Sequence, residues 1–379
     1  MAVTDFKIHL MTSSGSGFPA SLMRCLEQVT VSQSDQAPQN FEITFTDDYS
    51  TSDFQNISVA SASELQIGSR VKIGASVGNS SKLLMDGVIT QISYHPPTDT
   101  NEGSFTITGE DISYFMDIID RSMEYPFCLD AAIVAALLAP YLALGIIPHI
   151  GESIVGILDL FTTPQQMGTD RQTLIQLASS HAFIFCIRTD DLFGQTSAYW
   201  GPPPYDDPIQ PALVLGSSGN GNVEQIEFGF DGTKPKRTWA LVENKETDLP
   251  IPIATLTSTS MRGFSAHPAL TSSAVLTAKN KAIYQQGMGV PLAWARAQAA
   301  TNCSADSAVT AQGKVDALRY GQVMSAPGVI AVSGAGSLYD GKYYISNVTH
   351  KITRTSYDQE FSLQRDGIGT TLQKVQVSS

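Results

Sequence analysis

Two stretches far apart in the chain decide the fold: DGVITQISYH at residues 86–95 and DGKYYISNVTH at residues 340–350. Each begins with Asp-Gly, which favours a turn, and continues with β-branched and aromatic residues, which favour a strand. A second alternating stretch follows each one after a loop, FTITGED at residues 105–111 and FSLQRDG at residues 361–367. Four residues occupy the predicted repeat turns: Asp86, Gly87, Asp340 and Gly341. The repeat predicts two related β domains, one at each end of the chain, with chance similarity as the alternative.

The residues between the two stretches have a different pattern. Leu129, Ile133 and Leu137 are four apart and predict a helix over residues 128–139. The sequence TDRQ at residues 169–172 has the spacing of a capping box and predicts the start of a second helix. The apolar residues 182–187 then predict a strand, so this segment mixes helices and strands.

These patterns together predict an α+β chain that is mainly β. We expect a first barrel-like β domain at residues 1–115 and a smaller mixed α/β domain at residues 116–205. A second barrel-like β domain is expected at residues 206–379, with an insertion rich in Ala and Ser at about residues 261–320. Within that insertion, residues 291–300 favour a helix.

The composition argues against several classes of partner. Charged residues make up only 16% of the 379 residues, and the formal net charge is −13. So acidic a protein is not expected to bind nucleic acid stably through a broad surface. Residues 131–148 are apolar, but Pro140 interrupts them, so we expect a buried helix and no membrane insertion. Residues 1–10 lack the pattern of a secretory signal peptide.

No pattern for catalysis, metal binding or a cofactor stands out. The four cysteines, Cys25, Cys128, Cys186 and Cys303, are far apart and are expected to be buried free thiols. The six histidines are scattered, and we expect His95 and His350 to be surface or interface residues. We therefore predict no catalytic residue, no metal ligand, no cofactor and no enzyme activity.

Two segments resemble a known family. The first is TDRQTLIQLASSHAFIF at residues 169–185, with WGPP at residues 200–203. The second is YDGKYYISNVTH at residues 339–350, with FSLQRDG at residues 361–367. They are similar, in the same order, to motifs of the phage tail hub proteins, also called the late control protein D family. Relatives of this family form the base of spike proteins in type VI secretion and contractile injection systems.

The resemblance implies a structural role in the baseplate. In this family two similar barrels per chain form a homotrimer, whose ring adapts a hexameric inner tube to a trimeric spike. The expected partners are the spike protein, the inner tube protein and other baseplate proteins. The expected location is the virion tail baseplate or an assembled injection particle, after synthesis in the bacterial cytoplasm. No residue distinguishes a phage from a phage-derived device.

The resemblance also gives the C-terminal residues a predicted role. In the spike proteins of this family the puncturing domain follows the last hub strand, so the end of that strand is expected to face the spike. The predicted spike-facing residues are Ile368, Leu372, Lys374, Val375 and Val377. The alternative is that these residues complete the chain's own barrel.

Two other functional classes remain as alternatives to a structural hub. One is a tail-associated peptidoglycan hydrolase, which needs two carboxylates on either side of a cleft. The other is a β protein that binds a receptor or a carbohydrate, for which we expect exposed aromatic platforms. Three tryptophans are relevant to that second class: Trp200, Trp239 and Trp294.

Overall fold

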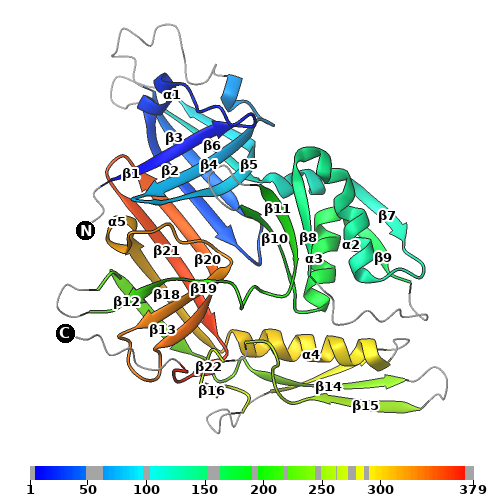
Figure 1. Cartoon of the computed structure of the whole chain (residues 1–379). Coiled ribbons are helices and arrows are strands. Elements are labelled where there is room, and N and C mark those ends of the chain that lie inside the picture. The colour runs from blue at the N-terminus through cyan, green and yellow to red at the C-terminus, as the bar shows by residue number, and fades with distance from the viewer. Residues whose placement is uncertain are drawn as a thin grey trace.

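The protein is mainly β, with a large antiparallel sheet and few helices (Figure 1). This confirms the predicted fold class. The computed structural model describes residues 5–47, 63–96, 103–151, 163–189, 195–216, 221–243, 249–261, 263–271, 279–285 and 290–371. Among these residues the large sheet has twelve strands.

The first half of this sheet, here called the first β unit, is built from the N-terminal strands. Its strands are β1 (Phe6–Thr12), β2 (Leu26–Ser34), β3 (Asn40–Asp47), β4 (Arg70–Val77), β5 (Ser80–His95) and β6 (Gly103–Asp111). They lie in the order β1-β4-β5-β6-β3-β2, and every neighbouring pair is antiparallel. Two short helices belong to this unit: α1 (Ala20–Cys25) and η2 (Ser63–Leu65).

The second half, here called the second β unit, repeats this arrangement. Its strands are β12 (Ile209–Val214), β13 (Gln225–Phe230), β18 (Val309–Asp316), β19 (Gly328–Ser333), β20 (Gly341–Thr353) and β21 (Tyr357–Arg365). They lie in the order β12-β19-β20-β21-β18-β13, so each strand has a counterpart in the first unit. The two units differ in one strand direction, since β12 is parallel to β19, whereas β1 is antiparallel to β4. Helix α5 (Ala317–Tyr320) follows β18.

The two repeated hairpins also share an irregularity. The β5–β6 ladder shifts its register between Ile89 and Gln91, and the β20–β21 ladder shifts between Ile345 and Asn347. Each shift places one extra residue on the first strand, as a β-bulge does. The same strand order and the same bulge indicate that the sequence repeat is a structural repeat.

Strand β2 of the first unit pairs antiparallel with β20 of the second, from Gln28 opposite Thr353 to Ser34 opposite Asn347. This ladder joins the two units into one sheet, although residues 35–346 separate its ends in the sequence (Figure 1). Each unit nevertheless has its own core. Val29, Ile43 and Phe45 belong to the first core, and Val309, Tyr343 and Ile345 to the second.

A mixed unit lies beside the first β unit (Figure 1). Its helices are η3 (Ile112–Asp117), α2 (Asp130–Leu138), η4 (Ala139–Leu144) and α3 (Asp170–Ser180). Its strands are β7 (Asp120–Glu124), β8 (Ile146–Ile150), β9 (Gln165–Thr169), β10 (Ile184–Thr189) and β11 (Thr196–Gly201). Trp200, Val134 and Leu174 are completely buried in its core, and the two predicted helices are both present.

An inserted unit forms a separate layer at the bottom of Figure 1. It contains β14 (Lys236–Glu243), β15 (Pro250–Thr255), β17 (Lys279–Gln285) and α4 (Val290–Asp306). Helix α4 packs on β14 and β15 through Leu292, Ala293 and Ala297. The short strands β16 (His267–Pro268) and β22 (Gly367–Ile368) pair with each other below the second β unit. The predicted domain boundaries at residues 115 and 205 stay predictions.

Several expectations about single residues were wrong. Asp86 and Gly87 lie inside strand β5 and not in a turn, because β5 begins six residues earlier, at Ser80. His350 is completely buried, since it faces the first core from β20 and its Nδ1 atom lies 2.9 Å from the Tyr357 hydroxyl. The thiols of Cys25 and Cys186 are buried as predicted, but two others are exposed: Cys128 and Cys303.

The close pairing of β3, β5 and β6 generates a test. A Cβ atom added at Gly109 would overlap the Val88 carbonyl oxygen and the Phe41 ring. We therefore expect Gly109→Ala to lower the free energy of unfolding by about 3 kcal/mol, because a close-packed interior cannot absorb the methyl group. Gly232→Ala is the matched control, since no atom lies within 4 Å of its added Cβ. Equal urea denaturation midpoints for the two variants would contradict this packing.

Candidate functional site

A cleft among the described residues lies where the two β units, the mixed unit and the inserted unit meet. Its volume is about 280 Å³. The loop at residues 35–39, which connects β2 to β3, forms one wall, and α3 and β10 form another. Asp306 from α4 and Tyr344 from β20 complete the lining. All four parts of the chain therefore contribute side chains to one small cleft.

Asp35 is a buried carboxylate in this cleft. It is 5% exposed, and its Oδ2 atom accepts a hydrogen bond of 2.7 Å from the Tyr344 hydroxyl. Its Oδ1 atom has no hydrogen-bond partner among the described residues. Burial raises the pKa of Asp35 to about 6, because the ionised form loses its hydration.

Asp306, at the end of α4, is a second buried carboxylate in the cleft. Its Oδ2 atom accepts a 2.9 Å hydrogen bond from the Tyr205 hydroxyl, and its Oδ1 atom accepts one from Ser260. Burial raises the pKa of Asp306 to about 7, although both hydrogen bonds act in the opposite direction. The Tyr205 ring also packs edge-on against Tyr344, with ring centroids 5.2 Å apart.

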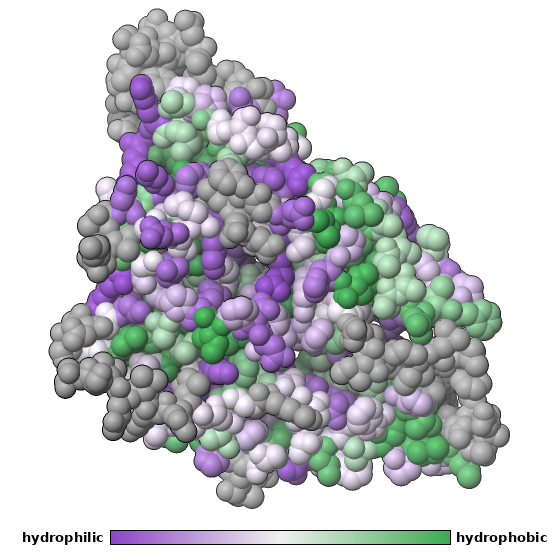
Figure 2. Space-filling model, viewed as in Figure 1, coloured by the Kyte–Doolittle hydropathy of each residue, from purple (hydrophilic) through white to green (hydrophobic). Residues whose placement is uncertain are grey.

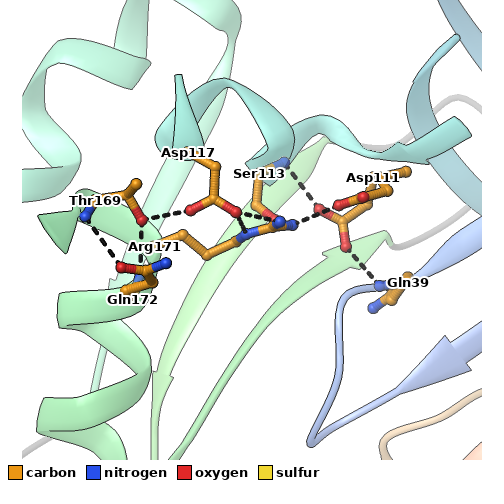
Figure 3. Close-up of polar contacts among 8 residues, drawn as sticks. Gln39, Asp111, Ser113, Asp117, Thr169, Arg171 and Gln172 are labelled. Atoms are coloured by element: carbon orange, nitrogen blue, oxygen red, sulfur yellow. Dashed lines mark hydrogen bonds and ion pairs between the residues drawn. The ribbon is translucent and has the colours of Figure 1, made fainter. Parts of the chain in front are cut away.

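An ionic network holds the mixed unit against the first β unit (Figure 3). Arg171 at the start of α3 forms ion pairs with Asp117 and with Glu110 on β6, the latter at 2.9 Å. Asp111 accepts hydrogen bonds from the backbone amides of Gln39 and Ser113, at 3.0 and 2.8 Å. Desolvation in this position raises the pKa of Asp111. The network fixes the wall of the cleft that α3 provides.

The predicted capping box is present at the start of α3 (Figure 3). The Thr169 hydroxyl accepts a hydrogen bond of 3.2 Å from the backbone amide of Gln172. The side-chain oxygen of Gln172 accepts one of 3.3 Å from the backbone amide of Thr169. The Thr169 hydroxyl also donates to Asp117. The cap and the Arg171 network therefore share one carboxylate.

Asp86, one of the predicted repeat positions, forms a second bridge between these units. Its carboxylate accepts two hydrogen bonds from Arg70, at 2.7 and 2.6 Å, and one from the Thr196 hydroxyl at 2.6 Å. Arg70 also donates to the Leu144 carbonyl oxygen at 2.8 Å. Asp86 is completely buried, which an ion pair of this bidentate kind makes possible.

The other predicted positions have different environments. Asp340 accepts a 2.7 Å hydrogen bond from the Ala335 backbone amide, and Gly341, the first residue of β20, has φ of 136°, a value that favours glycine. Ile368 pairs with His267 and packs against the core of the second β unit. The remaining predicted tail residues lie outside the described residues: Leu372, Lys374, Val375 and Val377.

The described residues contain no group of three or more His, Cys, Asp or Glu side chains that could hold a metal ion. No described helix is long and apolar enough to cross a membrane. Sequence patterns did not indicate Asp35 or Asp306, because each lies in a different part of the chain and only the fold brings them to one cleft.

No family model and no curated protein sequence matches this chain. It is similar over nearly its whole length to a tail protein from Neisseria meningitidis, with 14% identity, a TM-score of 0.63 and coverage of 97% of this chain and 98% of that chain. The chain has the fold of phage tail proteins.

Two other solved structures share this fold. A 43 kDa tail protein of prophage MuSo2 from Shewanella oneidensis is 15% identical, with a TM-score of 0.65 and coverage of 96% of this chain and 100% of that chain. An E. coli component of the type VI secretion system is 13% identical, with a TM-score of 0.53 and coverage of 96% and 77%. These similarities agree with the family indicated by the sequence motifs.

The raised pKa of Asp306 predicts how stability depends on pH. Between its usual pKa of 3.8 and about 7, the folded protein binds more protons at this site than the unfolded chain does. The free energy of unfolding therefore falls as the pH rises through this range. Asp306→Asn cannot ionise, so we expect it to reduce this fall by roughly 1–4 kcal/mol between pH 4 and pH 8.

Urea denaturation at several pH values measures this effect. Asp206→Asn is the control, because it removes an exposed carboxylate from a turn outside the cleft. An Asp306→Asn variant with the same pH dependence as the wild-type protein would show that the Asp306 carboxylate is not held in a desolvated position.

Proposed function

We propose that the protein is a structural hub of a phage tail or of a phage-derived contractile injection device. The observation that carries this proposal is the repeat of one six-strand order in two β units joined in one sheet. The fold shared with phage tail proteins supports it. The proposed location is the tail baseplate.

In this proposal three protomers form a ring around one axis. Two similar units in each protomer would give six similar units, so one face of the ring can match a hexameric tube. The other face keeps the true three-fold symmetry that a trimeric spike needs. The duplication therefore explains how one ring could match both the six-fold tube and the three-fold spike. A trimer of chains with a single unit would present only three units to the tube.

Exposed apolar residues on the mixed unit supply surfaces for contacts with other tail proteins. Figure 2 shows hydrophobic side chains gathered over this unit, at the right of the view. The exposed apolar residues of the mixed unit include Leu142, at 55% exposure, and Ile147, at 41% exposure. Apolar patches of this kind commonly mark protein interfaces. The proposed partners are the tube protein, the spike protein and other baseplate proteins.

A peptidoglycan hydrolase is the second candidate, and the two carboxylates of the cleft favour it. Asp35 and Asp306 have raised pKa values, as one acid of a glycosidase does. However, each carboxylate already accepts a hydrogen bond from a tyrosine hydroxyl. The cleft volume of about 280 Å³ is also at the lower limit for a small-molecule site. Release of reducing sugar from purified peptidoglycan, lost in Asp306→Asn, would establish this candidate in place of the hub.

The oligomeric state of the purified chain tests the proposed function. We expect native mass spectrometry to give a homotrimer, and class averages to show a ring with an open channel. We also expect the trimer to bind the hexameric tube protein of the same particle. A chain that remains monomeric at tens of micromolar and does not bind that tube protein would contradict the hub proposal.

The C-terminal residues generate a separate prediction. We propose that Leu372, Lys374, Val375 and Val377 contact the spike trimer. Ile368, the fifth residue of the predicted spike-facing set, packs against the chain's own core. Deletion of residues 370–379 should then leave the trimer and its binding to the tube protein intact but abolish co-purification of the spike protein. Spike binding by the shortened chain would exclude this contact, and loss of the trimer would favour a role in the chain's own fold.

A further inference from the structure

Strands β2 and β13 occupy the same place in the two β units, but they have different neighbours. Strand β2 pairs with β3 on one side and with β20 on the other. Strand β13 pairs with β18, the counterpart of β3, and ends the described order of the sheet. Strand β2 uses its second edge to pair with β20. The corresponding edge of β13 borders no strand within the described ranges.

Strands β20 and β5 show the complementary difference. The first part of β20 pairs with β19, from Gly341 to Ile345, and the part after the bulge pairs with β2, from Asn347 to Thr353. The first part of β5 likewise pairs with β4, which reaches Val88 in the described part of the chain. Strand β5 then continues beyond its bulge to His95. Residues 91–95 thus correspond to the part of β20 that binds β2.

We propose that β13 of one protomer pairs antiparallel with residues 91–95 of β5 in the next protomer. The contact between protomers would then repeat the β2–β20 contact within each protomer. The proposal rests on the proposed ring, and it specifies which strand edges close that ring. A second copy of this chain is the occupant, because among its described strands β5 carries the edge that the internal repeat matches to β13.

The internal repeat also sets the register. In each unit, residues that face one another on neighbouring strands form a row across the sheet. The row that starts at the first residue after the bulge can be compared between the two units. In the first unit the row is Gln91, Thr108, Glu42 and Thr30. In the second unit it is Asn347, Ser362, Gln312 and Glu227. Glu227 therefore corresponds to Thr30, and because Thr30 lies opposite Lys351, Glu227 should lie opposite His95.

This register brings compatible side chains together. Glu227 and His95 are both exposed, and a carboxylate opposite an imidazole is a favourable cross-strand pair. The next pair is Phe228 with Tyr94. In the single chain Phe228 is half-buried, and Tyr94 is 38% exposed. At the corresponding positions of the β2–β20 ladder, Val31 and His350 are both completely buried. Pairing between protomers would bury the two aromatic rings in the same way.

The proposed contact is a head-to-tail interface, in which each protomer offers one edge and receives another. Such an interface forms a closed ring when repeating the rotation between neighbours returns to the first protomer. Otherwise it forms an open filament. Closure would also cover the β13 edge, at which the described order of the sheet ends, and an edge covered in this way cannot take part in uncontrolled edge-to-edge association.

Disulfide crosslinking tests the strand pair and its register. The two exposed native thiols are first removed with Cys128→Ser and Cys303→Ser. In this background Glu227→Cys and His95→Cys are combined in one chain and oxidised with copper phenanthroline. We expect a covalent trimer on non-reducing gels, because facing residues of antiparallel strands are close enough for a disulfide.

Two controls accompany this variant. The pair Glu227→Cys and Gln91→Cys is out of register by four residues and should give at least tenfold less crosslinked trimer. Chains with only Glu227→Cys, mixed with chains with only His95→Cys, should give a covalent dimer and no trimer. A disulfide inside a single chain would instead contradict the proposal.

The wild-type oligomeric state separates failure of this contact from failure of the hub. A wild-type trimer whose in-register pair does not crosslink above the control would overturn the proposed strand pairing and leave the hub in place. A wild-type monomer without crosslinks would overturn both. Equal crosslinking of the in-register and out-of-register pairs would also exclude the defined register.

Discussion

The antiparallel ladder between β2 and β20 is the constraint on which the arrangement of the other units depends. It forces two units with separate cores to share one sheet. Its register is well specified, since Val29, Val31 and Ile352 are completely buried, and a shift by one residue would turn them to the other face. Gln33 adds to this junction: its side chain donates to the Leu84 carbonyl oxygen at 2.8 Å and accepts from the Ala326 amide at 3.1 Å.

The loop that follows β2 contacts the second β unit and the mixed unit, and it lines the same cleft as the inserted unit. Asp35 binds Tyr344 of the second β unit, and Gln39 donates to the Ile187 carbonyl oxygen of the mixed unit at 2.8 Å. Asp306 of the inserted unit faces the same cleft. The buried carboxylates cost stability at neutral pH, because desolvation raises the pKa values of Asp35 and Asp306. We infer that this cleft fixes the relative positions of the units.

The sequence predicted the mainly β fold class, the capping box at Thr169 and the repeated hairpin, because these depend on local patterns. It placed Asp86 and Gly87 in a turn, since an Asp-Gly pair inside a long, bulged strand looks the same as one that precedes a strand. It could not indicate the cleft of Asp35 and Asp306, because contacts between distant units leave no periodic pattern. The burial of His350 also depends on the joining of the two units.

The central claim is that the two β units take equivalent positions around one axis. A reconstruction of the purified particle by electron cryomicroscopy, calculated without imposed symmetry, tests this most directly. The account predicts three protomers, six similar β units around a channel, and continuous strand density between neighbouring protomers as well as within each one. A particle in which the second β unit of each protomer lies away from the ring formed by the first would contradict it.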